Sequence, residues 1–208
     1  MRWGWGWGRR AVTSKKVMSN QEVQNQEQKP EKCDIVEGKI NAQGVNMIRN
    51  ANEADAEALV NIYNYYITDT VITFEELPVT AEAFAGRISH ILEDGYPYLV
   101  AEEDGEILGY AYASQFRTRV AYRFTTETTV YLKHGVSGKG LGTALYTALL
   151  EELKKRKFHV ALGGITVPNA ASVALHEKLG FKKIAHFSEC GYKFNQWLDV
   201  GFWELKLG

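Results

Sequence analysis

The sequence has few cysteines and no long apolar run, and each shortage excludes a class of protein. Its 208 residues include two cysteines, Cys33 and Cys190, which lie far apart and lack the spacing of metal ligands. We therefore expect free thiols in a reducing compartment, with neither a disulfide framework nor a metal site. No apolar run approaches the ~20 residues that span a bilayer, and no apolar segment follows the positively charged N-terminus as it does in secretory signals. These absences predict a cytoplasmic protein without a membrane partner.

The sequence also lacks an excess of charge of either sign. It has 24 Lys and Arg against 25 Asp and Glu, a net charge of −1. Proteins that bind nucleic acid hold the phosphate backbone with clustered positive charge, so we do not expect a nucleic-acid partner. The 45% hydrophobic and 24% charged residues are typical of a globular protein with one core.

Composition changes near residue 47. Residues 1–46 carry eight Lys and Arg against five Asp and Glu, and include three tryptophans that alternate with glycines: Trp3, Trp5 and Trp7. A stretch rich in Gln, Asn, Glu and Lys follows over residues 20–32. Low hydrophobicity without an apolar period predicts a disordered extension. We interpret it as a tail rather than a functional arm, and place the folded domain at residues 47–208.

From residue 47 the chain alternates strand and helix patterns. A helix is expected after a cap at Asn52 and Asp55, and three more over residues 80–93, 141–153 and 169–179. Strands are expected at residues 98–101, 107–113, 125–132 and 159–165, with one before the first helix and two at the C-terminus; Asp104-Gly105 indicates a hairpin. This order predicts an α/β (α+β) fold, with a mixed sheet of about seven strands and helices on both faces.

A glycine-rich turn at residues 135–143 separates a predicted strand from a predicted helix. Glycines allow close approach of the backbone to a ligand, and the N-terminus of the following helix offers free N–H groups to an anion, which suits a diphosphate. Lys139 is followed by Gly140, which excludes the triphosphate-binding loop, and Thr143 stands where the dinucleotide fingerprint needs glycine. A purely structural tight turn is the alternative.

The segment Gly138-Lys-Gly140-Leu-Gly142 after Val130-Tyr-Leu132 resembles the pyrophosphate loop of the GNAT acetyltransferases, although Ser137 replaces the usual Gln or Arg. The stretch from Asn169 through His176 to Gly180-Phe181 resembles a second GNAT signature, with His176 at a position that is usually Tyr. The resemblance implies a GNAT fold and acetyl-CoA as co-substrate. It implies cofactor contacts from ten residues: Val130, Tyr131, Leu132, Gly138, Lys139, Gly140, Leu141, Gly142, Thr143 and Asn169.

Within that superfamily, the chain from residue 47 is similar to the phosphinothricin and methionine sulfoximine acetyltransferases. The similar stretches include residues 73–74, 116–122, 127–131, 175–177 and 191–203. The resemblance implies that Glu127 and His176 are catalytic and that four further residues line the substrate pocket: Phe74, Arg119, Tyr122 and Val200.

The residue types agree with that chemistry. An amine attacks a thioester only when unprotonated, so a base is needed near it. Glu127 lies among uncharged strand neighbours, and partial burial there is expected to raise its pKa. His176 can protonate the leaving thiolate or act as the base itself, and the sequence leaves open which residue is base and which is acid. The guanidinium groups of Arg117 and Arg119 suit a carboxylate or phosphinate.

Alternatives remain at this point. One is a GNAT enzyme for another small amine, such as a polyamine or an amino-sugar, and another is a module that binds acyl-CoA without turnover. Arg117 and Arg119 can alternatively be solvated loop residues without a function. Aromatic residues such as Phe74, Tyr122 and Trp197 often belong to the hydrophobic core and not to a pocket. From the family resemblance, with aromatic C-terminal strands, we expect a homodimer.

Overall fold

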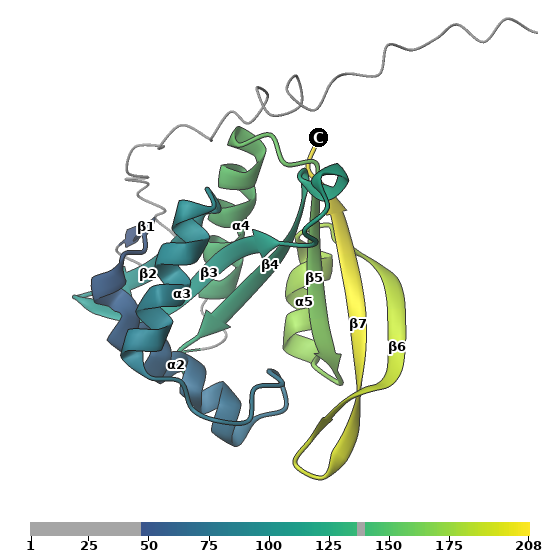
Figure 1. The fold of residues 1–208 in the computed structure, drawn as a ribbon, viewed down its shortest axis with the longest axis horizontal. Helices are drawn as coiled ribbons and strands as arrows, with labels where there is room; N and C mark the ends of the chain where they lie inside the picture. The colour runs from purple at the N-terminus through teal and green to yellow at the C-terminus, as the bar shows by residue number, and fades with distance from the viewer. Residues whose placement is uncertain (1–46, 137–139) are drawn as a thin grey trace, which may run out of the picture. The chain divides into compact units, whose positions relative to one another are not determined.

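The computed structural model describes residues 47–136 and 140–208, so the expected disorder of residues 1–46 lies outside the described residues. The described residues form seven strands, four α-helices and two short 3₁₀ turns (Figure 1). In chain order these elements are β1 Met47–Asn50, η1 Glu53–Asp55, α2 Ala56–Asp69, α3 Ala81–Glu93, β2 Tyr98–Glu103, β3 Glu106–Gln115, η2 Val120–Tyr122, β4 Thr125–Leu132, α4 Leu141–Lys155, β5 Val160–Val167, α5 Ala170–Lys178, β6 Lys182–Lys193 and β7 Gln196–Lys206.

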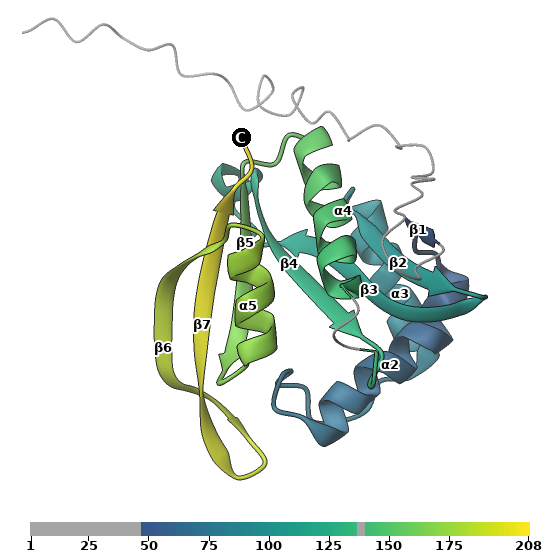
Figure 2. The same cartoon turned by 180° about the vertical axis from the view of Figure 1, so that it is seen from behind.

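The strands form one mixed sheet in the order β1-β2-β3-β4-β5-β7-β6. All neighbours are antiparallel except β4 and β5, which are parallel. Helices α2 and α3 lie on one face, and α4 and α5 lie on the other, as the two opposite views show (Figures 1 and 2). The predicted mixed sheet with helices on both faces is confirmed.

Each face of the sheet has its own apolar core. Leu145, Leu149 and Leu153 of α4 are fully buried on one side, whereas Leu59 and Ile67 of α2 are fully buried on the other. The residues within each helix are four or eight positions apart, a spacing that places them on one side of a helix. Burial of an aliphatic side chain contributes about 1.5–3 kcal/mol, so the two cores hold the helices to the sheet.

Local signals in the sequence explain where several elements begin and end. Asn52 and Asp55 form a reciprocal capping box, and Thr80 accepts a hydrogen bond from the N–H of Ala83 at the start of α3. Asp104 and Gly105 both have positive φ, as a two-residue hairpin turn requires. The predicted strand at residues 159–165 instead runs from Val160 to Val167, because its last residues pair with β7, a contact that sequence spacing does not reveal.

The sheet opens between its two parallel strands. Strands β4 and β5 pair at only three positions, from Thr125–Val160 to Glu127–Leu162. Beyond Glu127 the two strands diverge, so in the described part of the chain the rest of β4 has no ladder partner on that side. This fork leaves strand backbone available to a ligand that lies along it.

Candidate active site

A groove of about 590 Å³ lies at the fork. It is lined by α2 and the loop that follows it, β4, the start of α4 and the length of α5, and its size is that of a ligand pocket. Eight of the ten residues predicted to contact the cofactor line it: Val130, Tyr131, Leu132, Gly140, Leu141, Gly142, Thr143 and Asn169. The other two, Gly138 and Lys139, lie outside the described residues, as does Ser137.

The start of α4 has the features of an anion site. Gly140 is its N-cap residue, with φ of 79°, and no side chain of the described residues caps the helix there. The first N–H groups of a helix have no intrahelical acceptor, and the helix dipole is positive at that end. Gly140 and the first turn of α4 line the groove. These residues fit the diphosphate of a coenzyme.

Glu127 lies at the fork itself, on the face of the sheet that carries α2 and α3. It pairs with Ser114 of β3 and with Leu162 of β5. The next pair along β3 and β4 on this face is Tyr112 and Thr129, because alternate strand residues point to the same side. Burial raises the pKa of the Glu127 carboxyl, and the nearby charge of Arg117 lowers it in part. The expected partial burial and its effect on this pKa are therefore present.

His176 lies on α5 and is only 4% exposed. Its Nδ1 is 2.8 Å from the carbonyl oxygen of Ser172, which can only accept, so Nδ1 carries a proton. In the neutral ring, Nε2 then accepts from the hydroxyl of Tyr146 at 2.9 Å. Burial lowers the pKa of His176, which favours this neutral form.

Tyr146 extends this network to the sheet. Its hydroxyl is 2.6 Å from Oγ1 of Thr128, which lies 3.0 Å from the carbonyl oxygen of Leu162. Thr128 therefore points toward α4. Because strand residues alternate, its neighbour Glu127 points to the opposite face. The two predicted catalytic residues thus lie on opposite faces of the sheet at the fork, and no hydrogen bond joins them directly.

The loop before β4 carries the predicted anion-binding residues. The guanidinium of Arg117 lies 5.0 Å from the ring centre of Phe116 and 5.6 Å from that of Tyr122, both in cation–π range. Its charge reaches Glu127, so the structure brings Arg117, Tyr122 and Glu127 together. Arg119 is exposed in the same loop, immediately before η2.

The remaining predicted pocket residues come from the loop between α2 and α3 and from the β6–β7 hairpin. Val200 of β7 pairs with Thr166 of β5, and the ring of Phe74 packs on Gly191 of β6, where a Cβ would overlap it. Trp197 is 62% exposed and its ring lies tilted against that of Tyr192 at the end of the hairpin, so Trp197 lies at the surface.

The sequence interpretation did not single out Tyr112, Thr129 or Tyr146 as site residues. Tyr112 and Thr129 share the face of Glu127, and the period of two in strands was the signal that could have identified them. Tyr146 reads as an ordinary helix core residue, and only the packing of α4 against α5 reveals its contact with His176.

Two features of the described residues bear on other classes of function. Residues 47–136 and 140–208 contain no group of three or more His, Cys, Asp or Glu side chains placed to hold a metal ion. No helix within that part of the chain has the length and apolarity needed to cross a membrane.

Comparisons with known proteins agree with this geometry. Residues 48–201 match the model of the acetyltransferase (GNAT) domain family. The chain is 40% identical over 157 residues to the phosphinothricin N-acetyltransferase of Streptomyces viridochromogenes, covering 76% of this chain and 85% of that protein. It is 37% identical over 160 residues to the L-methionine sulfoximine/L-methionine sulfone acetyltransferase of Salmonella typhimurium, covering 77% and 94%.

Solved structures give the same result. A Salmonella typhimurium acetyltransferase in complex with acetyl-CoA has a TM-score of 0.76 and 36% identity, covering 78% of this chain and 94% of that one. A phosphinothricin acetyltransferase from Sinorhizobium meliloti, also bound to acetyl-CoA, has a TM-score of 0.76 and 38% identity, covering 78% and 88%. With its forked sheet and the glycine-rich start of α4, this chain belongs to the GNAT family and is an acetyl-CoA-dependent N-acetyltransferase.

Proposed function

We propose that the enzyme acetylates the amino group of a small, anionic, amino acid-like substrate such as phosphinothricin or methionine sulfoximine. The observation that carries this proposal is the position of Glu127, a carboxylate with a raised pKa at the fork of the sheet, within reach of the charge of Arg117. The relatives named for these two substrates support the choice of substrate class.

Glu127 is the proposed base. A carboxyl whose pKa is raised by burial is better matched to taking a proton from an ammonium near neutral pH than a solvated one. Arg117 and Arg119 would hold the carboxylate or phosphinate of the substrate, and Phe74, Tyr122 and Val200 would line its pocket. A guanidinium attracts such an anion and repels a polyamine, which favours the anionic substrate class over the cationic one.

The groove at the fork is the proposed site of acetyl-CoA, which supplies the acetyl thioester when bound. The free N–H groups at the start of α4 would hold its diphosphate, and the unpaired edge of β4 would hold its extended arm. Val130, Tyr131 and Leu132 provide that edge. Asn169, whose Oδ1 accepts from the N–H of Ser172, also lines the groove.

His176 is proposed as the second residue that handles protons. In the neutral ring its Nε2 accepts from the hydroxyl of Tyr146, and this pair can take up or pass a proton on the face of the sheet opposite Glu127. Neither cysteine is needed as a nucleophile, so direct attack by the amine is the simpler course.

The proposal is tested by measuring release of coenzyme A thiol with phosphinothricin, methionine sulfoximine, methionine sulfone, spermidine and kanamycin. We expect turnover with the amino acid analogues only, and a fall of at least about 100-fold in kcat for Glu127→Gln with unchanged acetyl-CoA binding. Turnover only with the two polycations would contradict the anionic pocket. Acetyl-CoA binding without turnover of any tested amine would favour the alternative of a non-catalytic acyl-CoA-binding module.

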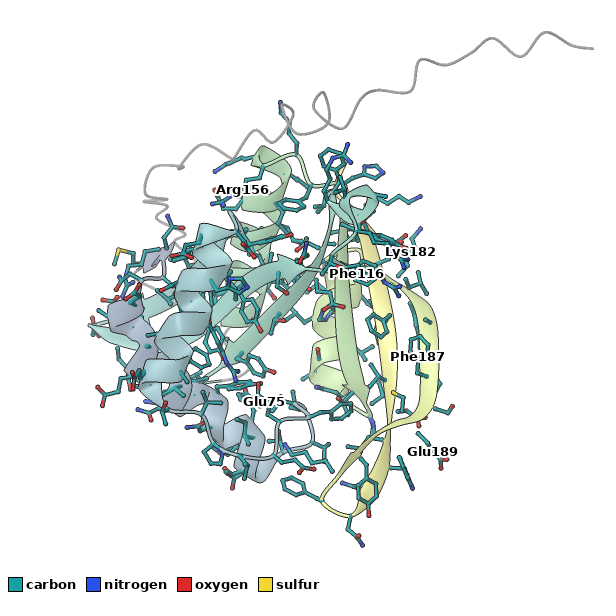
Figure 3. The ribbon with its side chains drawn as sticks, in the orientation of Figure 1. Glu75, Phe116, Arg156, Lys182, Phe187 and Glu189 are labelled. Atoms are coloured by element: carbon teal, nitrogen blue, oxygen red, sulfur yellow. The ribbon has the colours of Figure 1, made fainter. Side chains whose placement is uncertain are left out.

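A homodimer is the proposed assembly. The hairpin of β6 and β7 presents several exposed large apolar residues, namely Ile184, Phe187, Tyr192, Phe194 and Trp197. Phe187 projects from β6, the edge strand of the sheet, at the side of the molecule (Figure 3). Exposed apolar groups along an edge strand are typical of an interface. A single light-scattering mass of about 47 kDa, twice the chain mass of 23.4 kDa, would support the dimer, and 23 kDa would exclude it.

The catalytic domain is proposed to span residues 47–208. Met47 begins the first strand, and the buried side chain of Ile48 follows at once. A protein that lacks residues 1–46 should therefore keep its activity, whereas removal of residues 1–50 should destabilise it.

A further inference from the structure

Lys193, the last residue of β6, is a buried cation. It is 1% exposed, and its Nζ donates to the carbonyl oxygen of Thr73 at 2.8 Å and lies 3.5 Å from that of Tyr66. Within residues 47–136 and 140–208, no carboxylate lies within the 4.0 Å of an ion pair with this ammonium. The carboxylates of Glu76 and Glu75 act on this ammonium from beyond that distance, so the two carbonyl groups are its direct polar partners. Burial of a charge without an adjacent counter-ion is costly, and these contacts therefore need an explanation.

The two carbonyl groups belong to the C-terminus of α2 and to the loop that follows it, residues 70–80. Tyr66 is in the last turn of α2, where carbonyl groups lack intrahelical donors and the helix dipole is negative. A lysine ammonium is favourable at such an end. Lys193 reaches it from the β6–β7 hairpin, which belongs to the other half of the forked sheet.

The loop has separate anchors to its own helices. Asn64 of α2 makes hydrogen bonds of 3.0 and 2.9 Å with the backbone carbonyl and N–H of Val79, and the hydroxyl of Tyr63 is 2.9 Å from Oγ1 of Thr73. These bonds hold the loop on α2 without help from β6. Lys193 adds a link across the fork, where the loop and the hairpin lie side by side in both views (Figures 1 and 2).

The residues next to Thr73 also contact the far half of the sheet. The ring of Phe74 packs on Gly191, two residues before Lys193, and a Cβ on Gly191 would overlap that ring. The carbonyl oxygen of Ile72 lies 3.5 Å from Oγ1 of Thr166 in β5. The loop therefore bridges the fork near the end of β5, and Lys193 provides its shortest polar contact with β6.

We propose that Lys193 is a positioning residue for the amine substrate: by tying Thr73 and the end of α2 to β6, its ammonium holds Phe74 against Gly191 as a wall of the amine pocket. The proposal deepens the proposed function and rests on it, since Phe74 is a pocket wall only if the amine binds on the Glu127 face. Lys193 acts through the loop and does not touch the reacting atoms.

The first test compares Lys193→Met, which keeps an apolar stem of four heavy atoms and removes the ammonium, with Lys182→Met as a matched control. Lys182 is an exposed lysine at the other end of the same strand (Figure 3). We expect Lys193→Met to raise KM for the amine about ten-fold, because a displaced pocket wall loses binding contacts with the amine that are equal in the ground state and the transition state. The KM for acetyl-CoA and kcat should stay within about two-fold of wild type. An unchanged amine KM, or equal rises in both KM values, would overturn the proposal.

A second variant covers the case in which Lys193→Met does not fold. Gly191→Ala keeps the lysine and displaces the Phe74 ring directly, so it should raise the amine KM in the same way; an unchanged KM would overturn the role of this wall.

Hydrogen exchange provides a readout that needs no turnover. In Lys193→Met, but not in Lys182→Met, amides of residues 70–76 should exchange at least about ten-fold faster, while those of β4 keep their protection. Unchanged exchange in the loop would overturn the link. If the wild-type enzyme acetylates none of the tested amines, the proposed function fails, and the exchange result alone decides whether Lys193 holds the loop.

Discussion

At the scale of single residues, the environment of Glu127 makes the pH dependence of the enzyme testable. Burial raises the pKa of this carboxyl, and the charge of Arg117 lowers it in part. In Arg117→Met the pKa should therefore rise further, and the acid limb of the kcat/KM profile should move to higher pH. Arg123→Met is the matched control, since Arg123 lies over Phe124 and should leave the limb in place. An identical acid limb in Arg117→Met would show that Glu127 is not the titrating base.

Two adjacent glycines of β5 provide a matched pair for the position of His176. A Cβ on Gly163 would overlap Nε2 and Cδ2 of the His176 ring, whereas a Cβ on Gly164 would meet the Phe202 ring at 3.5 Å, an ordinary contact. Gly163→Ala should therefore push His176 away from Tyr146, at a cost of about 1–3 kcal/mol in unfolding free energy. Gly164→Ala should cost less than about 1 kcal/mol. Urea unfolding of both variants gives the comparison, and equal losses would contradict it.

At the scale of elements, α3 can be stabilised without touching the site. Gly86 lies inside this helix, and a Cβ there would meet no atom within 4 Å. A helical glycine costs roughly 0.5–1 kcal/mol relative to alanine, since it loses more backbone entropy on folding. Gly86→Ala should thus raise the unfolding free energy by that amount, measured by urea denaturation, with kcat unchanged. A lower stability of Gly86→Ala would show that an interaction other than helix propensity governs this position of α3.

The start of α4 should respond in the opposite way. Gly140 has φ of 79°, a conformation that costs a branched residue about 1–2 kcal/mol. Gly140→Val should distort the first turn of the helix. KM for acetyl-CoA should therefore rise about ten-fold or more, and KM for the amine should change less. Initial-rate kinetics with each substrate varied in turn separate the two effects. A change confined to the amine KM would show that the diphosphate does not bind at this turn.

At the scale of the whole molecule, His176 links stability to pH. Burial lowers its pKa in the folded state. At a pH between the folded-state and unfolded-state pKa values, His176 therefore binds a proton mainly in the unfolded chain. The contribution of His176 is therefore present above the unfolded pKa of ~6.5 and is lost as pH falls below it, by at most about 1.4 kcal/mol per pH unit.

The raised pKa of Glu127 acts with the opposite sign, so the wild-type curve alone does not isolate the histidine. The difference between wild type and His176→Gln isolates it. We expect the melting temperature of wild type to fall more steeply than that of His176→Gln between pH 7.5 and 5.5. Parallel curves of melting temperature against pH would show that protonation of His176 does not change the folding equilibrium.

The sequence by itself determined the elements and the ligand class. Capping residues such as Asn52 and Thr80, the hairpin at Asp104-Gly105 and the apolar period of α4 act over a few residues, so spacing alone predicts them. The same holds for the glycines at the start of α4, whose conformational freedom is a property of the residue.

The tertiary structure decided how these parts meet. The contact of His176 with Tyr146 and that of Lys193 with Thr73 join residues 30 and 120 positions apart. The fork after Glu127, and the opposite faces of Glu127 and His176, depend on strand pairing. Such contacts depend on the order and register of the strands, which one chain's local pattern does not encode. The chemistry was thus readable from residue types, whereas its arrangement followed only from the packed sheet.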